Sequence, residues 1–221
     1  LQQNAKRDLH ALHLERIEEG PEELQPSQSN NLTETLNLSE NPLECLPSTL
    51  TTLKVSKEQW KNLKEHICNI TSLKDLDLSW NKLTELPESI GNLTRLEYLG
   101  LSSNQLTSLP ESIKTLTQLK NLNLWRNQLT SLPETIGNLT QLESLDLSMN
   151  QLTELPESIK NLTQLKTLDL RYNPLESLPS TLTTLSVDKE QWNNLKEHIC
   201  NITSLKYLDL IEIDLTSLPE T

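Results

Sequence analysis

One phrase returns along most of this chain at a step of 23 residues. It reads LKDLDLSWNKLTELPESIGNLTR from Leu73 and comes back with substitutions from Leu96, Leu119 and Leu142. Leucine occupies the same places in every copy, while the chain has no Phe and only one Met, so side chains of mixed shape do not fill its core. A core built by stacking one layer many times is typical of solenoid proteins, in which each unit packs on the next.

The full frame is LxxLxLxxNxLxxLPxxIxxLxx, which resembles the leucine-rich-repeat signature over about residues 33–221. Its LPxxIxxLxxL part is most similar to intracellular repeats of the Ras-scaffold, plant intracellular and bacterial effector types. The resemblance implies an α/β leucine-rich-repeat solenoid, or horseshoe, with a parallel concave β-sheet of about nine short strands and a convex side of turns and short helices. We expect residues 1–32 to form an N-terminal helix and loop, either a cap on the first repeat or the tail of an upstream domain. We expect residues 33–221 to form the repeat domain.

Two stretches of 40 residues break the regular step, from Thr33 to Leu73 and from Leu165 to Leu205. Each divides into a unit of 17 residues and a unit of 23, and residues 41–78 match residues 173–210 almost throughout, which indicates a duplicated block. The longer units carry KEQWKNLKEHIC or KEQWNNLKEHIC, in which Trp, Leu and Ile recur at helical spacing after the N-cap candidates Ser56 and Asp188. We predict a helix in each, with Trp60 and Trp192 turned inward.

An Asn at the ninth position of the frame is expected to turn the chain out of each strand and to hydrogen-bond the backbone of adjacent turns. Glu58, Glu190 and Ile213 replace it, and we expect irregular curvature at these three repeats because neither Glu nor Ile reproduces the bonds of the amide. The ladder residues are Asn41, Asn81, Asn104, Asn127, Asn150 and Asn173.

The chemistry-bearing residues form no catalytic or metal motif in the sequence. The four His residues have no Cys, Ser or carboxylate partner at motif spacing, and no glycine-rich phosphate loop occurs. Cys45, Cys68 and Cys200 form no disulfide framework, and we expect reduced, partly buried thiols. We predict that the chain is not an enzyme and uses no cofactor. Its formal charge of −12 argues against a nucleic-acid partner, and no apolar run approaches the roughly 20 residues that span a bilayer.

Positions 3, 5, 7 and 8 of the frame should project from the concave sheet into solvent, where folding does not require apolar side chains. Five of the seven aromatic residues fall there, interleaved with arginines, and these are the residue types enriched at binding hot spots. A row of Asp at position 5 predicts a partner with basic groups around an apolar patch, although duplication accounts for part of that row. The predicted partner-binding residues are Asp77, Trp80, Tyr98, Trp125, Arg126, Asp146, Met149, Asp169, Arg171, Tyr172 and Tyr207.

These features predict a recognition scaffold that binds a protein through its concave face. We expect it in a bacterial cytoplasm or delivered into a host cell, with secretion left open because the chain begins at Leu1. The resemblance also allows a substrate-recognition or regulatory part of a larger enzyme, such as a bacterial ubiquitin ligase or a Roco-type GTPase, or a surface adhesin. The repeat domain looks incomplete at its C-terminal end, which would leave Leu215 and Leu218 uncovered.

Overall fold

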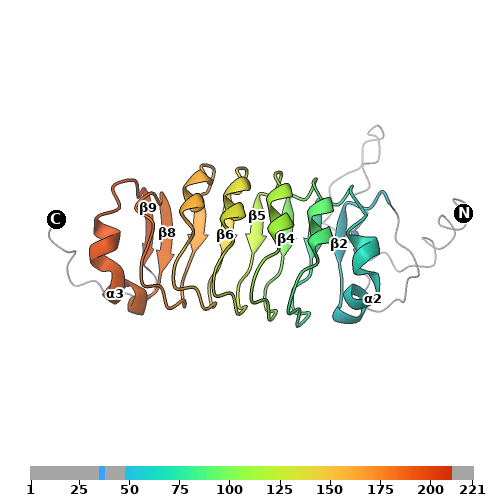
Figure 1. Ribbon diagram of the computed structural model, residues 1–221, viewed down its shortest axis with the longest axis horizontal. Coiled ribbons are helices and arrows are strands. Elements are labelled where there is room, and N and C mark those ends of the chain that lie inside the picture. Colours follow the sequence, from blue (N-terminus) through green and yellow to red (C-terminus); the bar gives the residue numbers. More distant parts are fainter. Residues whose placement is uncertain (1–34, 38–47, 211–221) are drawn as a thin grey trace, which may run out of the picture.

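The computed structural model describes residues 35–37 and 48–210 of the chain. The expected N-terminal cap over residues 1–32, Asn41, Cys45, and Ile213 with the following leucines lie outside the described residues. Among the described residues, nine strands form one parallel sheet in which every strand pairs with the next in chain order. This confirms the expected sheet, and Figure 1 shows the units side by side along the long axis of the molecule. The strands are β1 (Thr35–Asn37), β2 (Thr52–Lys54), β3 (Asp75–Asp77), β4 (Tyr98–Gly100), β5 (Asn121–Asn123), β6 (Ser144–Asp146), β7 (Thr167–Asp169), β8 (Thr184–Val187) and β9 (Tyr207–Leu210).

The strands pair on the frame that the sequence predicted, so the same leucine position meets itself from unit to unit. Leu76 lies opposite Leu99, and Leu122 opposite Leu145. The 17-residue units keep this register, since Leu36 of β1 pairs with Leu53 of β2 and β7 pairs with β8 in the same phase. The short units therefore lose residues from their connections, while their strands stay in place.

Helices follow the strands, as expected for a side of turns and short helices. Each 3₁₀-helix begins after the Pro of an LPES or LPET phrase, where a fixed φ and a missing N–H are well tolerated. They are η1 (Glu88–Asn92), η2 (Glu111–Thr115), η3 (Glu134–Asn138) and η4 (Glu157–Asn161), and the two α-helices are α2 (Lys57–Ile67) and α3 (Lys189–Cys200). Asp188 caps α3 by accepting the backbone N–H groups of Glu190 and Gln191. Both predicted helices are confirmed.

The frame leucines and the Ile of each LPxxI phrase pack into one continuous buried cluster. Trp60 and Trp192 belong to it, with 4% and 6% of their surfaces exposed, which confirms the inward positions predicted for them. The described cysteines are free, but their environments differ, because Cys68 is buried and Cys200 is exposed. Ser89 of η1, in the next unit, lies beside the Cys68 thiol. Partial burial was the wrong expectation for Cys200.

The asparagine ladder is present where the sequence placed it. The side chain of Asn127 donates to the carbonyl oxygens of Leu124 in its own unit and of Leu101 in the preceding unit, at 3.0 and 2.9 Å. Its Oδ1 accepts the backbone N–H of Leu106 at 3.0 Å. Asn104, Asn150 and Asn173 repeat this arrangement with their own neighbours, so each unit satisfies buried backbone groups of the one before it.

The ladder continues into the unit of Glu190, which corrects the prediction that its bonds would be lost. Gln191, one residue later, is only 3% exposed, and its Nε2 donates to the carbonyl oxygens of Leu170 and Asn173 at 2.6 and 3.1 Å. Leu170 is the residue whose carbonyl a ninth-position Asn of this unit would reach. Since α3 begins at Lys189, its first turn carries Gln191 inward and supplies the amide from a different position.

Candidate functional site

The eighth position of the frame has a left-handed backbone in five successive units. The φ angles lie between 53° and 64° at Trp80, Ser103, Arg126, Met149 and Tyr172. Residues at this position also hydrogen-bond to the next unit through their backbone. The N–H of Trp80 donates to the carbonyl of Ser102 at 2.9 Å, and the same bond recurs at Ser103, Arg126 and Met149. Bulky side chains in this region cost about 1 kcal/mol or more, whereas Gly and Asn adopt it readily. Four of the five positions nevertheless carry Trp, Arg, Met or Tyr.

These same side chains point into solvent. Trp80, Met149 and Tyr172 are 65%, 42% and 52% exposed, and Arg126 is exposed as well. Tyr207 on β9 is also exposed, whereas Trp125 and Arg171 at position 7 are half-buried. Large side chains whose backbone is strained and whose surface is exposed to water do not stabilise the core, and the apolar ones lower the solubility of the chain. They mark this edge of the sheet as the candidate functional site.

Trp80, Trp125 and Arg126 form one group, which we call the Trp–Arg cluster. The two indole rings come from units two steps apart, yet their centroids lie 6.2 Å apart with an interplanar angle of 67°, an edge-to-face contact. The guanidinium carbon of Arg126 lies 6.0 Å from each ring centroid, within cation–π range. The unit between them carries only the small Ser102 and Ser103 at positions 7 and 8, so no large side chain separates the rings.

The phenol ring of Tyr98 lies along the surface of the sheet, over Gly100, and does not project into solvent. A Cβ atom at Gly100 would be 2.9 Å from the hydroxyl of Tyr98 and 3.0 Å from Oδ1 of Asp77, so the absence of a side chain at Gly100 makes room for the phenol ring. Burial and then the nearby Asp77 raise the pKa of Tyr98. Tyr98 is thus half-buried and forms part of the floor of the site.

The aspartates at position 5 hold the backbone of their own units. Asp77, Asp146 and Asp169 each accept the N–H of the residue two positions later, at 2.9, 3.0 and 3.1 Å. Asn123 does the same for Trp125 at 3.0 Å, which shows that a neutral acceptor serves this turn as well as a charged one.

Two of these carboxylates are also paired with cations of the chain. Nζ of Lys54 lies 2.7 Å from Asp77, and Nε of Arg171 donates to Asp169 at 2.9 Å. Burial alone would raise the pKa of Asp77, but the hydrogen bonds from Lys54 and Ser79 outweigh it and the pKa lies below its ordinary value. Among the described residues, Asp146 has no cation within ion-pair distance, so the net acidity of this face is smaller than the row of Asp suggests.

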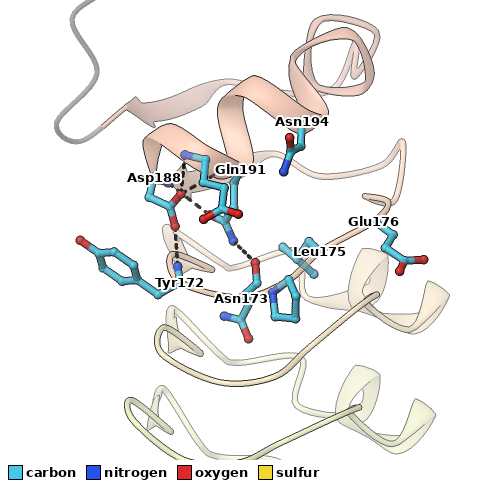
Figure 2. A pocket seen from close by; sticks show the side chains of 9 residues that line it. Tyr172, Asn173, Leu175, Glu176, Asp188, Gln191 and Asn194 are labelled. Carbon is cyan, nitrogen blue, oxygen red and sulfur yellow. Dashed lines mark hydrogen bonds between the residues drawn. The ribbon is translucent and has the colours of Figure 1, made fainter.

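A pocket of about 470 Å³ opens beside Tyr172, between the end of β7 and the start of α3. Figure 2 shows the Tyr172 ring directed away from the α3 side chains that line the pocket, while Oδ2 of Asp188 accepts the Tyr172 N–H at 2.6 Å. The lining residues are Tyr172, Asn173, Pro174, Leu175, Glu176, Asp188, Glu190, Gln191 and Asn194. Glu176, Asp188 and Glu190 form no ion pair with described residues, although both oxygens of Asp188 accept backbone N–H groups, so the pocket is acidic mainly through Glu176 and Glu190.

Sequence reasoning placed the strands that carry the predicted residues but missed what supports them. Lys54, Gly100 and Ser103 were not among the predicted residues. Lys54 and Gly100 occupy position 5, where most units carry Asp or Asn, and Ser103 occupies position 8, where the neighbouring units carry Trp or Arg. No group of three or more His, Cys, Asp or Glu that could hold a metal occurs within residues 48–210. None of the helices in that part of the chain is long and apolar enough to cross a membrane.

Two family profiles match this repeat array. One, described as a leucine-rich repeat region, matches residues 49–152, and another, described as two copies of leucine-rich repeats, matches residues 140–184. The chain is a leucine-rich-repeat protein. Leucine-rich-repeat domains generally serve as protein-interaction scaffolds and are typically non-enzymatic, which gives the exposed sheet edge a context. No curated protein sequence matches the chain significantly.

Solved structures of bacterial leucine-rich-repeat proteins share the fold. A leucine-rich-repeat protein of Leptospira interrogans is 32% identical with a TM-score of 0.63, over 79% of this chain and 53% of that one. The internalin InlF of Listeria monocytogenes is 26% identical with a TM-score of 0.59, over 83% and 58%. InlP of the same species is 29% identical with a TM-score of 0.52, over 73% and 46%. The chain thus spans about half the length of these structures.

Proposed function

We propose that this leucine-rich-repeat chain is a recognition scaffold whose sheet face binds a protein partner. One observation carries the proposal. Trp80, Arg126, Met149 and Tyr172 are exposed at positions where the left-handed backbone disfavours them. Residues that stabilise neither backbone nor core, and that belong to the types enriched at hot spots, are best explained by contacts with another molecule.

The predicted basic groups of the partner have specific counterparts on this face. Asp146 belongs to the same unit as Met149 and forms no ion pair with a described residue, and the pocket beside Tyr172 adds Glu176, Asp188 and Glu190. A partner with lysine or arginine around an apolar patch would meet Met149 and Tyr172 flanked by these carboxylates. Electrostatic complementarity of this kind favours specificity and the rate of association.

We propose an intracellular site of action, in a bacterial cytoplasm or in a host cell that receives the protein. The free thiols of Cys68 and Cys200 fit a reducing compartment, where disulfides are rare. The solved relatives from Leptospira and Listeria support a bacterial origin.

The proposal is tested by capturing partners on the immobilised chain and measuring each captured protein by calorimetry against matched variants. Trp80→Ala and Trp125→Ala should each weaken binding by roughly 2 kcal/mol or more, as central aromatic anchors do. Both should change the free energy of unfolding by no more than about 1.5 kcal/mol, which is the usual worth of one aromatic pair.

Trp60→Ala is the reciprocal control. It empties a buried position of the core and should cost about 3–5 kcal/mol of stability without removing a partner contact. If Trp125→Ala unfolds the chain while Trp60→Ala leaves it stable, the assignment of inside and outside is reversed and the proposed face is wrong.

A further inference from the structure

The guanidinium of Arg126 lies within cation–π range of two indole rings but forms no ion pair with a described residue. The ion pairs among described residues are Lys54–Asp77, Lys74–Glu97, Lys120–Glu97, Lys166–Glu143 and Arg171–Asp169, and Arg126 takes part in none of them. Arg171 on the same face shows the contrast, because it forms a fork of hydrogen bonds with Asp169. In a chain of formal charge −12, an exposed arginine without a carboxylate is a site where a ligand can supply one.

The contact with both indole rings prepares Arg126 for such a ligand. The planar guanidinium presents N–H donors that can form a two-pronged bond with a carboxylate. Its carbon lies 6.0 Å from each ring centroid, at the outer limit of cation–π range, so the rings leave those donors available. The Trp80 ring is 65% exposed and offers an apolar surface beside them.

The row of acidic side chains is interrupted beside the Trp–Arg cluster. Position 5 carries Gly100 in β4 and Asn123 in β5, whereas β3, β6 and β7 carry Asp77, Asp146 and Asp169. Asp77 is paired with Lys54, so the nearest unpaired carboxylate of the row is Asp146, one strand beyond β5. Position 5 therefore carries no charge at β4 and β5, next to the cation of Arg126, while Asp75 at position 3 of β3 keeps a carboxylate that forms no ion pair with a described residue.

We propose that the Trp–Arg cluster binds an Asp or Glu side chain of the partner protein together with an apolar or aromatic side chain next to it. The carboxylate accepts hydrogen bonds from Arg126, and the neighbouring side chain packs on the exposed Trp80 ring. This inference rests on the proposed function and refines it. Basic groups of the partner then belong toward Asp146 and the Tyr172 pocket, so the partner has a fixed direction along the sheet.

The experiment selects phage-displayed random peptides on the full chain and on variants of it. The wild type should enrich Asp or Glu adjacent to an aromatic or apolar residue, and Arg126→Glu should enrich Lys or Arg at that place instead. Affinities of the selected peptides are then measured by tryptophan fluorescence. Arg126→Gln should weaken them by about tenfold or more, as expected for hydrogen bonds to a charged group. Arg95→Gln, at an exposed arginine outside the cluster, should leave them unchanged.

Thermal melting of Arg126→Gln should match the wild type, since the side chain is exposed, and this separates lost recognition from lost folding. Peptides that depend on Trp80 but show no preference for Asp or Glu would overturn this inference and leave the proposed function standing. Selection that yields no peptide dependent on Trp80 would overturn the inference, while the captured partner still decides the proposed function. Saturable quenching by a dT oligonucleotide that Arg126→Gln abolishes would also overturn it, because the cluster would then recognise phosphate and bases.

Discussion

Replacing Gln191 by Ala should remove three hydrogen bonds from a site with almost no access to water. Its side chain is 3% exposed, donates to the carbonyls of Leu170 and Asn173, and accepts the backbone N–H of Asp188 at 3.2 Å. The Leu170 carbonyl keeps the side-chain donor of Asn173, and the Asn173 carbonyl keeps the backbone N–H of Leu175, so neither is left unpaired. A hydrogen bond contributes about 0.5–1.5 kcal/mol net, so we expect the loss of three to cost about 1.5–4.5 kcal/mol.

Asn193→Ala is the matched control, because it changes an exposed residue of the same helix and should be nearly neutral. Urea unfolding followed by circular dichroism gives the free energies of unfolding. Solenoid units can open regionally, so hydrogen exchange should be measured as well, and the amides of α3 should lose more protection than those near β3. Gln191→Ala and Asn193→Ala with equal unfolding midpoints and equal exchange would refute the role assigned to Gln191.

Two further predictions follow from the environments of titratable groups. Iodoacetamide should label Cys200 and spare Cys68 in the native chain, because Cys68 is buried and burial raises the pKa of its thiol; peptide mass mapping checks this, and equal labelling would contradict it. The folded-state pKa of Asp77 is lowered, so its stabilising contribution is complete above the unfolded pKa and is lost as the pH falls through the folded pKa. Below about pH 4 the wild type should therefore lose stability more steeply than Asp77→Asn, and parallel urea midpoints for the two would rule this out.

The repeat frame predicted inside and outside well, because burial in a solenoid depends mainly on the position within a unit. Trp60 and Trp192 were placed in the core from spacing alone, and the 17-residue units were placed in register with the others. Spacing did not predict that Gln191 would replace the ladder asparagine. α3 begins at Lys189, one residue before the ninth position of the frame, and its first turn carries Gln191 inward in place of Glu190.

The repeat frame also did not predict the side-chain contacts between units. The frame gives the separation of the Trp80 and Trp125 backbones but not the direction of their rings, which meet because Ser102 and Ser103 are small. The aspartates of position 5 were interpreted as free charges, whereas Asp77 and Asp169 hold their own turns and pair with cations of the chain. Hydrogen bonds to backbone leave no trace in a pattern of residue types, so this part of the site required coordinates.

The constant register of β1 with β2 and of β7 with β8 shows that the length of a unit and the register of its strand are independent in this fold. A unit can lose six residues, since 23 − 17 = 6, and the loss falls on its connection while the strand stays in step. Deletions within a connection and duplications of whole units therefore leave the strand register intact. Positions 7 and 8 can then vary in each unit, one side chain at a time, without altering the pairing of the strands. Such an array allows new partner specificities to arise by recombination of units as well as by substitution, and the duplicated block of this chain records one such event.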